Sequence, residues 1–360
     1  MKKILLLLFI LFANICLAEQ KSNHKIIAYY TGNAEKLRHY PLHKLTHIIY
    51  SFVKLQNDSL MLRDAEQERT VIQIVALKKR YPQLKILVSM GGWSGCAPCS
   101  DLFASTQHRQ TFAKTTVALL KKYHLDGIDL DWEYPAIEGF PGHQYQKADK
   151  NNFTELIRTL REEMGNRYLL SFAAGGFEQY LNESVDWQEV TPMVDFINLM
   201  TYDLVGGYAT VTGHHTPLYS YRAHQESTDK CVSWLLNQNI PADKLIIGAA
   251  FYARVWEGVS AENNGLYQKG VFKEAVDYHK FNQYFSDTSG FVYHWDEKAK
   301  APYQYNAQKQ LFATFDNERS IEEKAKYVRN LGLGGIMFWE LVLDKPQNGL
   351  VELMHRVLKN

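Results

Sequence analysis

Eight short apolar runs, separated by longer segments of helical periodicity, most constrain the fold of this chain. They lie at residues 25–30, 46–52, 85–90, 126–133, 169–174, 195–200, 245–251 and 335–340. Strands that alternate with helices form a parallel sheet, and eight of them in 360 residues predict an α/β fold, the closed (β/α)8 TIM barrel. An open doubly wound sheet is the alternative. No Gly-x-Gly-x-x-Gly follows the first run, so a dinucleotide-binding fold gains no support.

The clearest helical patterns and one exception to the alternation complete this prediction. The helices are expected at 66–81, 107–123, 147–164, 228–239 and 321–331. From 254 to about 312 the chain has many Tyr, Phe, Asn and Lys residues but no helical period, and it is too long for a plain connection. We interpret residues 255–312 as a small α+β module inserted between strands 7 and 8.

The fourth run carries four acids among large apolar residues: Asp126-Gly127-Ile128-Asp129-Leu130-Asp131-Trp132-Glu133-Tyr134-Pro135. Side chains alternate along a strand, so Asp129, Asp131 and Glu133 share one face. Asp126 is out of phase with them and is expected to support the strand start or a neighbouring loop. Like charges at this spacing, together with burial, raise the pKa of at least one acid. A general acid needs such a raised pKa near neutral pH. A solvated acidic edge strand is the alternative, but the interleaved residues are not Lys or Thr.

The N-terminus has the pattern of a secretory signal peptide at residues 1–18. Lys2 and Lys3 precede an apolar run at 4–12, and Cys16-Leu17-Ala18 forms a small-residue cleavage site. An uncleaved anchor would need a longer apolar run, and a lipoprotein signal would not place Ile15 before the cysteine. We therefore expect a secreted protein, periplasmic or extracellular, with no membrane anchor.

Cys96-Ala97-Pro98-Cys99 is the one close pair of cysteines. A zinc site would need a second ligand pair, and none has the spacing. In an exported protein a local Cys96–Cys99 disulfide is predicted, with free thiols as the alternative. His214-His215 is not expected to bind a metal, because adjacent histidines rarely reach one ion and no third ligand is evident.

The charge balance excludes one class of partner. Lys plus Arg is 40 and Asp plus Glu is 39, which gives a formal charge of +1 and no electrostatic case for nucleic acid binding. Aromatic residues make up 13% of the chain, which suits a protein that stacks flat ligand faces.

Aromatic and acidic residues gather where the predicted strands end, and the site of a TIM barrel lies at those C-terminal ends. In chain order they are Tyr29, Phe52, Gly92, Trp93, Glu133, Met200, Tyr202, Asp203, Tyr252, Arg254 and Trp339. Their convergence on one rim makes them the candidate site residues.

This set of motifs resembles glycoside hydrolase family 18, the chitinases. The acid stretch fits the family's Asp-x-x-Asp-x-Asp-x-Glu signature, and Ser89-Met90-Gly91-Gly92 resembles its Ser-x-Gly-Gly motif. Met200-Thr201-Tyr202-Asp203 resembles the strand-six motif, and Trp339 the strand-eight tryptophan. Tyr252 and Arg254, followed by an insertion, resemble the subgroup with a chitinase insertion domain. The resemblance covers residues 24–360, so we expect one catalytic barrel over 19–360.

The resemblance implies substrate-assisted catalysis, in which the 2-acetamido group of the substrate is the nucleophile. Glu133 would protonate the glycosidic oxygen and later activate water. Asp131 would orient the acetamide, Asp129 would share a proton with Asp131, and Tyr202 would bond the acetamide carbonyl.

The remaining rim residues would bind the sugars. Trp339 would form a hydrophobic floor, Trp93 would stack on the leaving-group side, and Asp203 and Arg254 would contact sugar hydroxyls or each other. Tyr29, Phe52, Gly92, Met200 and Tyr252 complete the expected substrate-binding set.

The implied function is a retaining enzyme that cleaves β-1,4-linked N-acetylglucosamine in chitin or chitooligosaccharides, as a monomer and without cofactor or metal. Three alternatives stay open. A non-catalytic chitin-binding lectin would usually lack Glu133, an endo-enzyme on N-glycans would generally lack the insertion, and a peptidoglycan hydrolase is disfavoured only by the absence of a wall-binding repeat.

Overall fold

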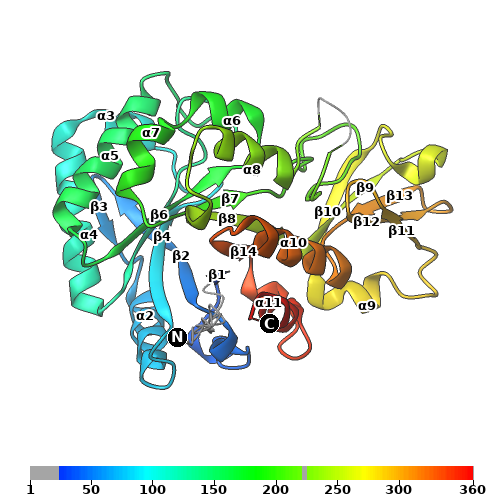
Figure 1. Ribbon diagram of the computed structural model, residues 1–360, viewed down its shortest axis with the longest axis horizontal. Helices are drawn as coiled ribbons and strands as arrows, with labels where there is room; N and C mark the ends of the chain where they lie inside the picture. The colour runs from blue at the N-terminus through cyan, green and yellow to red at the C-terminus, as the bar shows by residue number, and fades with distance from the viewer. Residues whose placement is uncertain (1–23, 221–224, 360) are drawn as a thin grey trace, which may run out of the picture.

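Eight parallel strands close into a barrel in the computed structural model, which describes residues 24–220 and 225–359 (Figure 1). Their order around the barrel is β1-β2-β4-β5-β6-β7-β8-β14, and pairing of β14 with β1 closes it. The predicted (β/α)8 TIM barrel is confirmed. The predicted signal peptide, residues 1–18, lies outside the described residues.

The barrel strands are β1 (Lys25–Tyr30), β2 (His47–Gln56), β4 (Lys85–Gly91), β5 (Gly127–Asp131), β6 (Leu169–Gly175), β7 (Phe196–Met200), β8 (Leu245–Ala250) and β14 (Gly335–Trp339). The helices around them are α1 (Ala34–Leu37), α2 (Ala65–Ala76), α3 (Cys99–Ala104), α4 (Thr106–Tyr123), α5 (Asp149–Met164), α6 (Glu178–Glu183), α7 (Trp187–Val190), α8 (Thr228–Asn237), α10 (Glu318–Leu331) and α11 (Leu350–Lys359). No helix within 24–220 and 225–359 combines the length and the apolar character needed to cross a membrane.

Local side chains set several of the helix ends. Ser105 caps α4 by accepting a hydrogen bond from the backbone of His108. Asn317 and Ser320 form a reciprocal capping box at the start of α10, and Gly332 ends that helix in the left-handed conformation at φ 63°. These caps place α10 against the outside of β14, which it precedes in the chain.

The barrel interior is packed in two chemically different layers. An apolar cluster fills most of it: Ile27, Tyr29, Ile49, Leu87, Ala173, Phe196, Met200, Ile246 and Met337. A polar layer of Ser89, Asp129, Ser171 and Asn198 is also fully buried. Burial of polar groups is tolerated only with hydrogen-bond partners, so this layer marks where the strands meet a site.

A five-stranded antiparallel sheet follows β8 and precedes β14, in the order β10-β9-β13-β12-β11. Its strands are β9 (Tyr252–Glu257), β10 (Val271–Asp277), β11 (Val292–Asp296), β12 (Ala301–Asn306) and β13 (Leu311–Thr314), with one short helix, α9 (Phe281–Tyr284). The sheet begins at Tyr252, earlier than the residues 255–312 proposed for the module. Tyr252 and Arg254 therefore lie on β9 and face the barrel rim.

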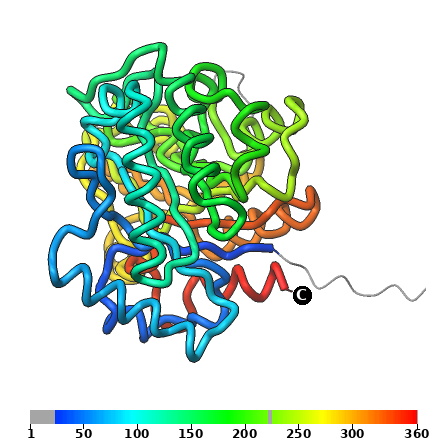
Figure 2. The backbone as a smooth tube through the Cα atoms, turned by 90° about the vertical axis from the view of Figure 1, so that its left-hand side faces the viewer, coloured from blue at the N-terminus to red at the C-terminus, as the bar shows by residue number. Residues whose placement is uncertain are grey.

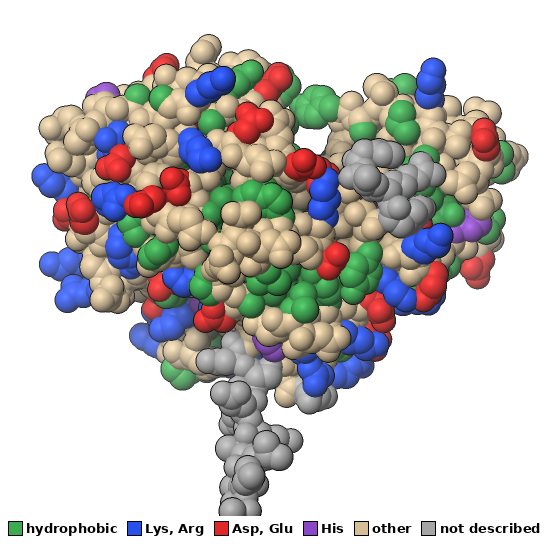
Figure 3. Space-filling model, turned by 45° about the horizontal axis from the view of Figure 1, so that its top comes forward, with side chains coloured by type: hydrophobic (Ala, Val, Ile, Leu, Met, Phe, Trp, Pro, Cys, Tyr) green, Lys and Arg blue, Asp and Glu red, His purple; other side chains and the backbone are tan. Residues whose placement is uncertain are grey.

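The outer surface shows how these parts are arranged. Helix α11 lies beside β1, so the two ends of the described chain are neighbours (Figure 2), and Lys359 Nζ donates to the His24 carbonyl over 2.9 Å. The face in Figure 3 is notched between the barrel and the inserted sheet, and basic and acidic side chains are interspersed on it. A mixed-charge face agrees with the near-neutral charge of the sequence.

Candidate active site

Asp129 lies inside the barrel and is held by four hydrogen-bond donors. Its Oδ2 accepts from Tyr29 Oη at 2.9 Å and Ser89 Oγ at 3.0 Å, and its Oδ1 accepts from Ser171 Oγ at 2.7 Å and Asn198 Nδ2 at 3.0 Å. Burial raises the pKa of Asp129, although these bonds favour the charged form. Ser171 and Asn198 were not among the predicted site residues.

Asp131 follows on the same face of β5, at its C-terminal end. Its side chain is buried, and its Oδ1 has no hydrogen-bond partner in the described part of the chain. Burial raises the pKa of Asp131 well above its usual range, and the charges of Glu133 and Asp129 add to the effect. Both oxygens of Asp129 accept hydrogen bonds from other residues, and the structure shows no hydrogen bond between Asp129 and Asp131. The predicted sharing of a proton between the two aspartates therefore has no direct hydrogen bond in this structure.

Glu133 lies just beyond the end of β5, because the strand ends at Asp131, two residues earlier than predicted. The peptide bond between Glu133 and Tyr134 is cis. Burial raises the pKa of Glu133 to about 7; hydrogen bonding with Tyr134 opposes the shift, and the charge of Asp203 adds to it. This side chain can therefore hold a proton near neutral pH and release it there.

Two glycines let β4 and its loop approach β5 closely. A Cβ on Gly91, whose φ is +115°, would lie 2.0 Å from the Asp131 carbonyl oxygen, and one on Gly92, at φ +81°, would lie 2.5 Å from the Phe52 ring. The Gly92 amide also donates to the Asp131 carbonyl over 2.8 Å. The Ser-x-Gly-Gly motif thus fixes the strand that carries the acids.

Trp339 forms an aromatic floor at the end of β14. Its ring is stacked on Phe52 at a centroid distance of 5.7 Å and tilted against Tyr29 at 5.8 Å. Tyr29 is only 1% exposed and its hydroxyl is bonded to Asp129, so it has no surface left for a sugar. The prediction that Tyr29 binds substrate is corrected: it supports Asp129 and Trp339 from below.

Tyr202 and Met200 come from the end of β7 and pack beside this floor. Met200 belongs to the barrel's apolar cluster, against which Tyr202 and Trp339 also pack. Burial raises the pKa of Tyr202 well above its usual range, with the charges of Asp131 and Glu133 among the further causes. Its hydroxyl is therefore a neutral donor beside the acids.

Asp203 is fixed on the other side by the inserted sheet. Arg254 donates to both of its oxygens, Nε to Oδ1 at 2.7 Å and Nη2 to Oδ2 at 2.6 Å, and Tyr252 Oη donates to Oδ2 at 2.9 Å. His215 Nδ1 lies 3.4 Å from Oδ1. Burial opposes ionisation, but the contacts with His215 and Arg254 outweigh it and hold the pKa of Asp203 well below its usual range. Asp203 and Arg254 therefore bind each other, the second of the two predicted outcomes.

Trp93 stands at the open side of the site, 38% exposed. Its ring approaches Tyr134, Phe140 and Tyr208 at centroid distances of 6.2, 5.9 and 6.2 Å. Tyr208, which is 71% exposed, was not predicted, because nothing in a glycine-rich loop indicates where its one aromatic will point. A narrow recess lies beside Glu133, lined in part by His143 and Tyr145.

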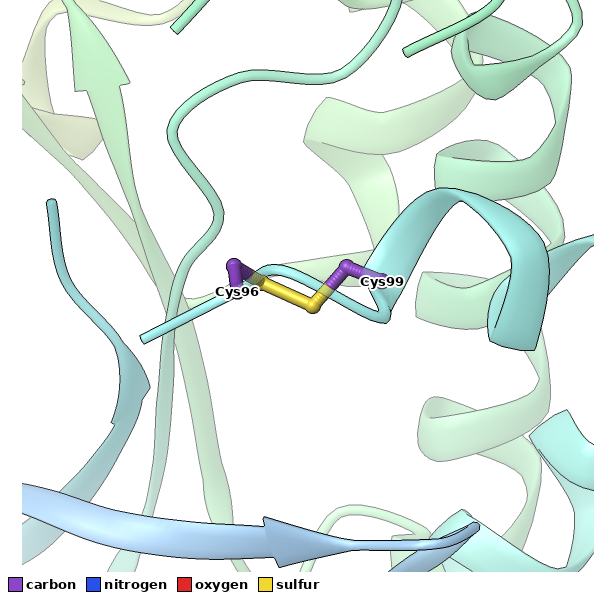
Figure 4. The surroundings of a disulfide bond; sticks show 2 residues. All are labelled: Cys96 and Cys99. Atoms are coloured by element: carbon purple, nitrogen blue, oxygen red, sulfur yellow. A yellow bond between two sulfur atoms is a disulfide. The ribbon is translucent and has the colours of Figure 1, made fainter. Parts of the chain in front are cut away.

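The two cysteines after β4 are disulfide-bonded, with the sulfur atoms 2.03 Å apart (Figure 4). Cys99 is the first residue of α3, and Cys96 lines the recess beside Glu133. Cys231 is a buried free thiol in α8. Asp126 accepts from Lys78 Nζ at 2.7 Å and from the Ile86 amide at 2.8 Å, at the start of β5 as its position out of phase implied.

The histidine pair is split between two partners. His214 Nε2 lies 3.1 Å from Asp296 Oδ2, while His215 faces Asp203. Across residues 24–220 and 225–359, no three His, Cys, Asp or Glu side chains are grouped closely enough to hold a metal ion.

The fold and this arrangement together define a TIM-barrel glycosidase site, with an acid of raised pKa beyond the two buried acids of β5, and an aromatic floor. The sequence model of the family described as Glycosyl hydrolases family 18 matches residues 25–344. The chain belongs to this family.

Individual relatives agree. The chain is 34% identical to Chitinase A1 of Niallia circulans over 76% of its own length but only 42% of that protein's. It is 31% identical to Chitotriosidase-1 of Mus musculus, covering 89% of this chain and 73% of that one. A solved structure, a glycoside hydrolase family 18 N-acetylglucosaminidase from Paenibacillus barengoltzii, superposes with a TM-score of 0.83 at 35% identity, over 93% of this chain and 99% of that one.

Proposed function

We propose that this protein is a secreted, retaining glycoside hydrolase that cleaves β-1,4-linked N-acetylglucosamine in chitin and chitooligosaccharides. One observation carries the proposal: Glu133, with a pKa of about 7, lies at the barrel mouth directly after the buried acids Asp129 and Asp131. Chitinase, chitotriosidase and N-acetylglucosaminidase are the names of the relatives compared above, which supports this substrate class.

The proposed reaction is substrate-assisted, which needs only one carboxyl group at the glycosidic oxygen. Glu133 donates its proton to that oxygen as the bond to the anomeric carbon breaks. The carbonyl oxygen of the 2-acetamido group attacks the same carbon and forms an oxazolinium ion. Glu133, now a carboxylate, takes a proton from the water that opens this ring, and the configuration is retained.

Asp131 and Tyr202 are assigned to the acetamide. The unpartnered Oδ1 of Asp131 is a free acceptor for the acetamide N–H, and the neutral Tyr202 hydroxyl is a donor for its carbonyl. Burial keeps the pKa of Asp131 high in the empty site, and the positive charge that develops on the acetamide nitrogen in the oxazolinium ion favours the carboxylate form, to which the N–H bond is strongest. Asp129, held by its four donors, would fix Asp131 from below.

The aromatic residues supply the sugar-binding surfaces in this proposal. Trp339, backed by Phe52, would lie under the sugar whose bond is cleaved. The exposed faces of Trp93 and Tyr208 would hold the sugar that leaves. Flat, weakly polar ring faces suit the apolar faces of pyranose rings.

Secretion and a monomeric state belong to the same proposal. The basic start and apolar run at residues 1–18 support export. The Cys96–Cys99 disulfide supports export to an oxidising compartment, since cysteine thiols are kept reduced in the cytosol.

The test is product analysis on N-acetylglucosamine oligomers of known length, with wild type beside Glu133→Gln. We expect the substitution to keep oligomer binding and to lower turnover at least ~100-fold, the usual scale of general acid catalysis. Equal rates would contradict the assignment of Glu133. Binding without turnover in both proteins would indicate a lectin, and glycan release from a glycoprotein without oligomer cleavage would indicate an N-glycan enzyme. Release from peptidoglycan alone would favour the wall-directed alternative.

A further inference from the structure

An ion pair that no step of the proposed reaction uses lies behind the active site. Lys324 Nζ of α10 is 2.6 Å from Asp316 Oδ2, and both side chains are 0% exposed. Asp316 also accepts from Ser320 Oγ at 2.7 Å and from the Ala250 amide, at the end of β8, at 3.1 Å. Because both charges lose their water, a buried pair contributes little net stability compared with apolar side chains. The pair is therefore better explained by a role in fixing the positions of the groups around it than by a contribution to the stability of the fold.

Thr216 connects this pair to the segment that follows β7. Its Oγ1 accepts from Lys324 Nζ at 2.5 Å and lies 3.1 Å from Asp316 Oδ2 and 3.2 Å from the Thr201 carbonyl oxygen. A hydroxyl has one proton, whereas an ammonium group has three. Thr216 Oγ1 is within donating distance of both Asp316 Oδ2 and the Thr201 carbonyl, and the ammonium of Lys324 compensates the charge of Asp316, which weakens that carboxylate as a competitor for the Thr216 proton. Without Lys324, the carboxylate would be the stronger acceptor and would take that proton.

The bond to Thr201 is one of two that enclose Tyr202 and Asp203 in the segment after β7. Thr216 holds the Thr201 carbonyl, and the carbonyl of His215 accepts from the Leu204 amide over 3.0 Å. Tyr202 and Asp203 lie between these two bonds. Asp203 has a φ of 54°, a conformation that a non-glycine residue keeps only where its surroundings fix it.

We propose that Thr216, oriented by the buried pair of Asp316 and Lys324, is a positioning residue that sets the place of Tyr202 and Asp203 in the active site. The inference rests on the proposed function, in which Tyr202 bonds the acetamide. A displacement of about 1 Å in such groups costs up to ~100-fold in rate.

The first experiment compares three single variants by oligomer hydrolysis. Thr216→Val removes the hydroxyl and keeps the shape, and we expect kcat to fall about 10- to 100-fold with a smaller change in KM. Thr216→Ser restores the hydroxyl and should restore most of kcat. Thr212→Val is the matched control: Thr212 is a buried threonine of the same segment, but its Oγ1 donates to Gly265 of the inserted sheet over 2.6 Å. It should lose similar thermal stability and keep kcat.

Two further measurements separate positioning from general destabilisation. Adding Lys324→Met to Thr216→Val should cost kcat no more than Lys324→Met alone, because the two changes break one connection. Hydrogen exchange of the amides at 200–205 should speed up in Thr216→Val and not in Thr212→Val, and this readout does not depend on activity. If the wild-type protein cleaves no oligomer, the proposed function is overturned. The hydrogen-exchange measurement then decides by itself whether Thr216 positions Tyr202 and Asp203. Unchanged kcat and exchange in Thr216→Val, or equal losses in both valine variants, would overturn the inference.

Discussion

At the scale of single residues, the proton on Glu133 is set by its neighbours, above all by burial and by the negative charge of Asp203. Glu133 must be protonated to act as the acid, so kcat/KM should fall as pH rises through about 7. Asp203→Asn removes a negative charge near Glu133 and leaves the positive charge of Arg254 uncompensated. Both effects lower the pKa of Glu133, so the alkaline limb of the pH–kcat/KM profile should move to lower pH.

The pH dependence of oligomer hydrolysis measures this shift directly. Asp126→Asn is a suitable control, because Asp126 lies at the opposite end of β5 and is paired with Lys78. Its alkaline limb should stay where the wild-type limb is. A limb that moves to higher pH in Asp203→Asn would show that Asp203 does not raise the pKa of Glu133.

The same raised pKa predicts a stability effect of known sign. Native Glu133 has a pKa above its value in an unfolded chain, so the native state binds the proton more tightly. The contribution of Glu133 to wild-type stability should therefore decrease between about pH 4.5 and pH 7, where the unfolded state has already lost this proton. Glu133→Gln cannot ionise and should melt at a higher temperature than wild type at pH 8, with the difference shrinking towards pH 4. Melting curves across this range are the measurement, and a constant difference would contradict the linkage.

Residue chemistry also explains which site residues the sequence could indicate. The acids of β5 are conspicuous because they interrupt an apolar run at regular spacing. Ser171 and Asn198 interrupt β6 and β7 in the same way, one polar residue within each buried strand, but a single serine or asparagine has many uses. Only the barrel register brings both to the one carboxylate of Asp129.

At the scale of elements, the contact between β4 and β5 depends on a missing side chain. Gly91 pairs with Asp131, and a Cβ there would meet the Asp131 carbonyl oxygen at 2.0 Å. Gly91→Ala should destabilise the protein by about 2–3 kcal/mol beyond the strain that a positive φ causes in an alanine, because the backbone of β5 must move to make room for the Cβ. Chemical denaturation measures the loss, and kcat should fall with it.

Gly142→Ala separates strain from contact in this experiment. Gly142 has a φ of +90°, close to that of Gly91, but a Cβ there meets no atom within 4 Å. It should cost only about 1 kcal/mol, the usual strain of a positive φ. Equal losses in the two variants would show that close approach to β5 is not what Gly91 provides.

The helices and strands were predicted correctly where a hydrophobic pattern recurs along the chain, and were mostly missed where the element is short. The apolar runs located all eight barrel strands, because both faces of a parallel sheet are buried. The hairpin that β2 makes with β3 (Ser59–Met61), the short helices α1, α3, α6 and α7, and the ten-residue helix α11 were not predicted. All of them except α11 have too few residues for a period, and tertiary packing holds them.

At the scale of the whole molecule, the inserted sheet and the barrel share a buried cluster, to which Val255, Ala313 and Phe315 contribute beside residues of the barrel strands and helices. The sheet's apolar cluster, which includes Trp256 and Phe312, also packs against Val205 and Ala209 of the loop after β7. Trp256 Nε1 donates to the Ala209 carbonyl over 3.0 Å. The loop that carries Tyr202 and Asp203 is thus enclosed between the two sheets, and neither part can unfold without exposing apolar surface of the other.

This shared buried cluster predicts that barrel and inserted sheet unfold together. Calorimetry should show a single transition in the wild type, and Trp256→Ala should lower its temperature by an amount that corresponds to about 3–5 kcal/mol, since the tryptophan is fully buried. Trp295→Ala is the matched control in the same sheet: its ring lies under the exposed Arg319, with the guanidinium 3.9 Å from the ring centroid, so about 1 kcal/mol is expected. If Trp256→Ala instead produced a separate early transition and left the main one unchanged, the inserted sheet would be an independently unfolding unit. Arg254 would then be released from Asp203 whenever that sheet unfolded, even with the barrel intact.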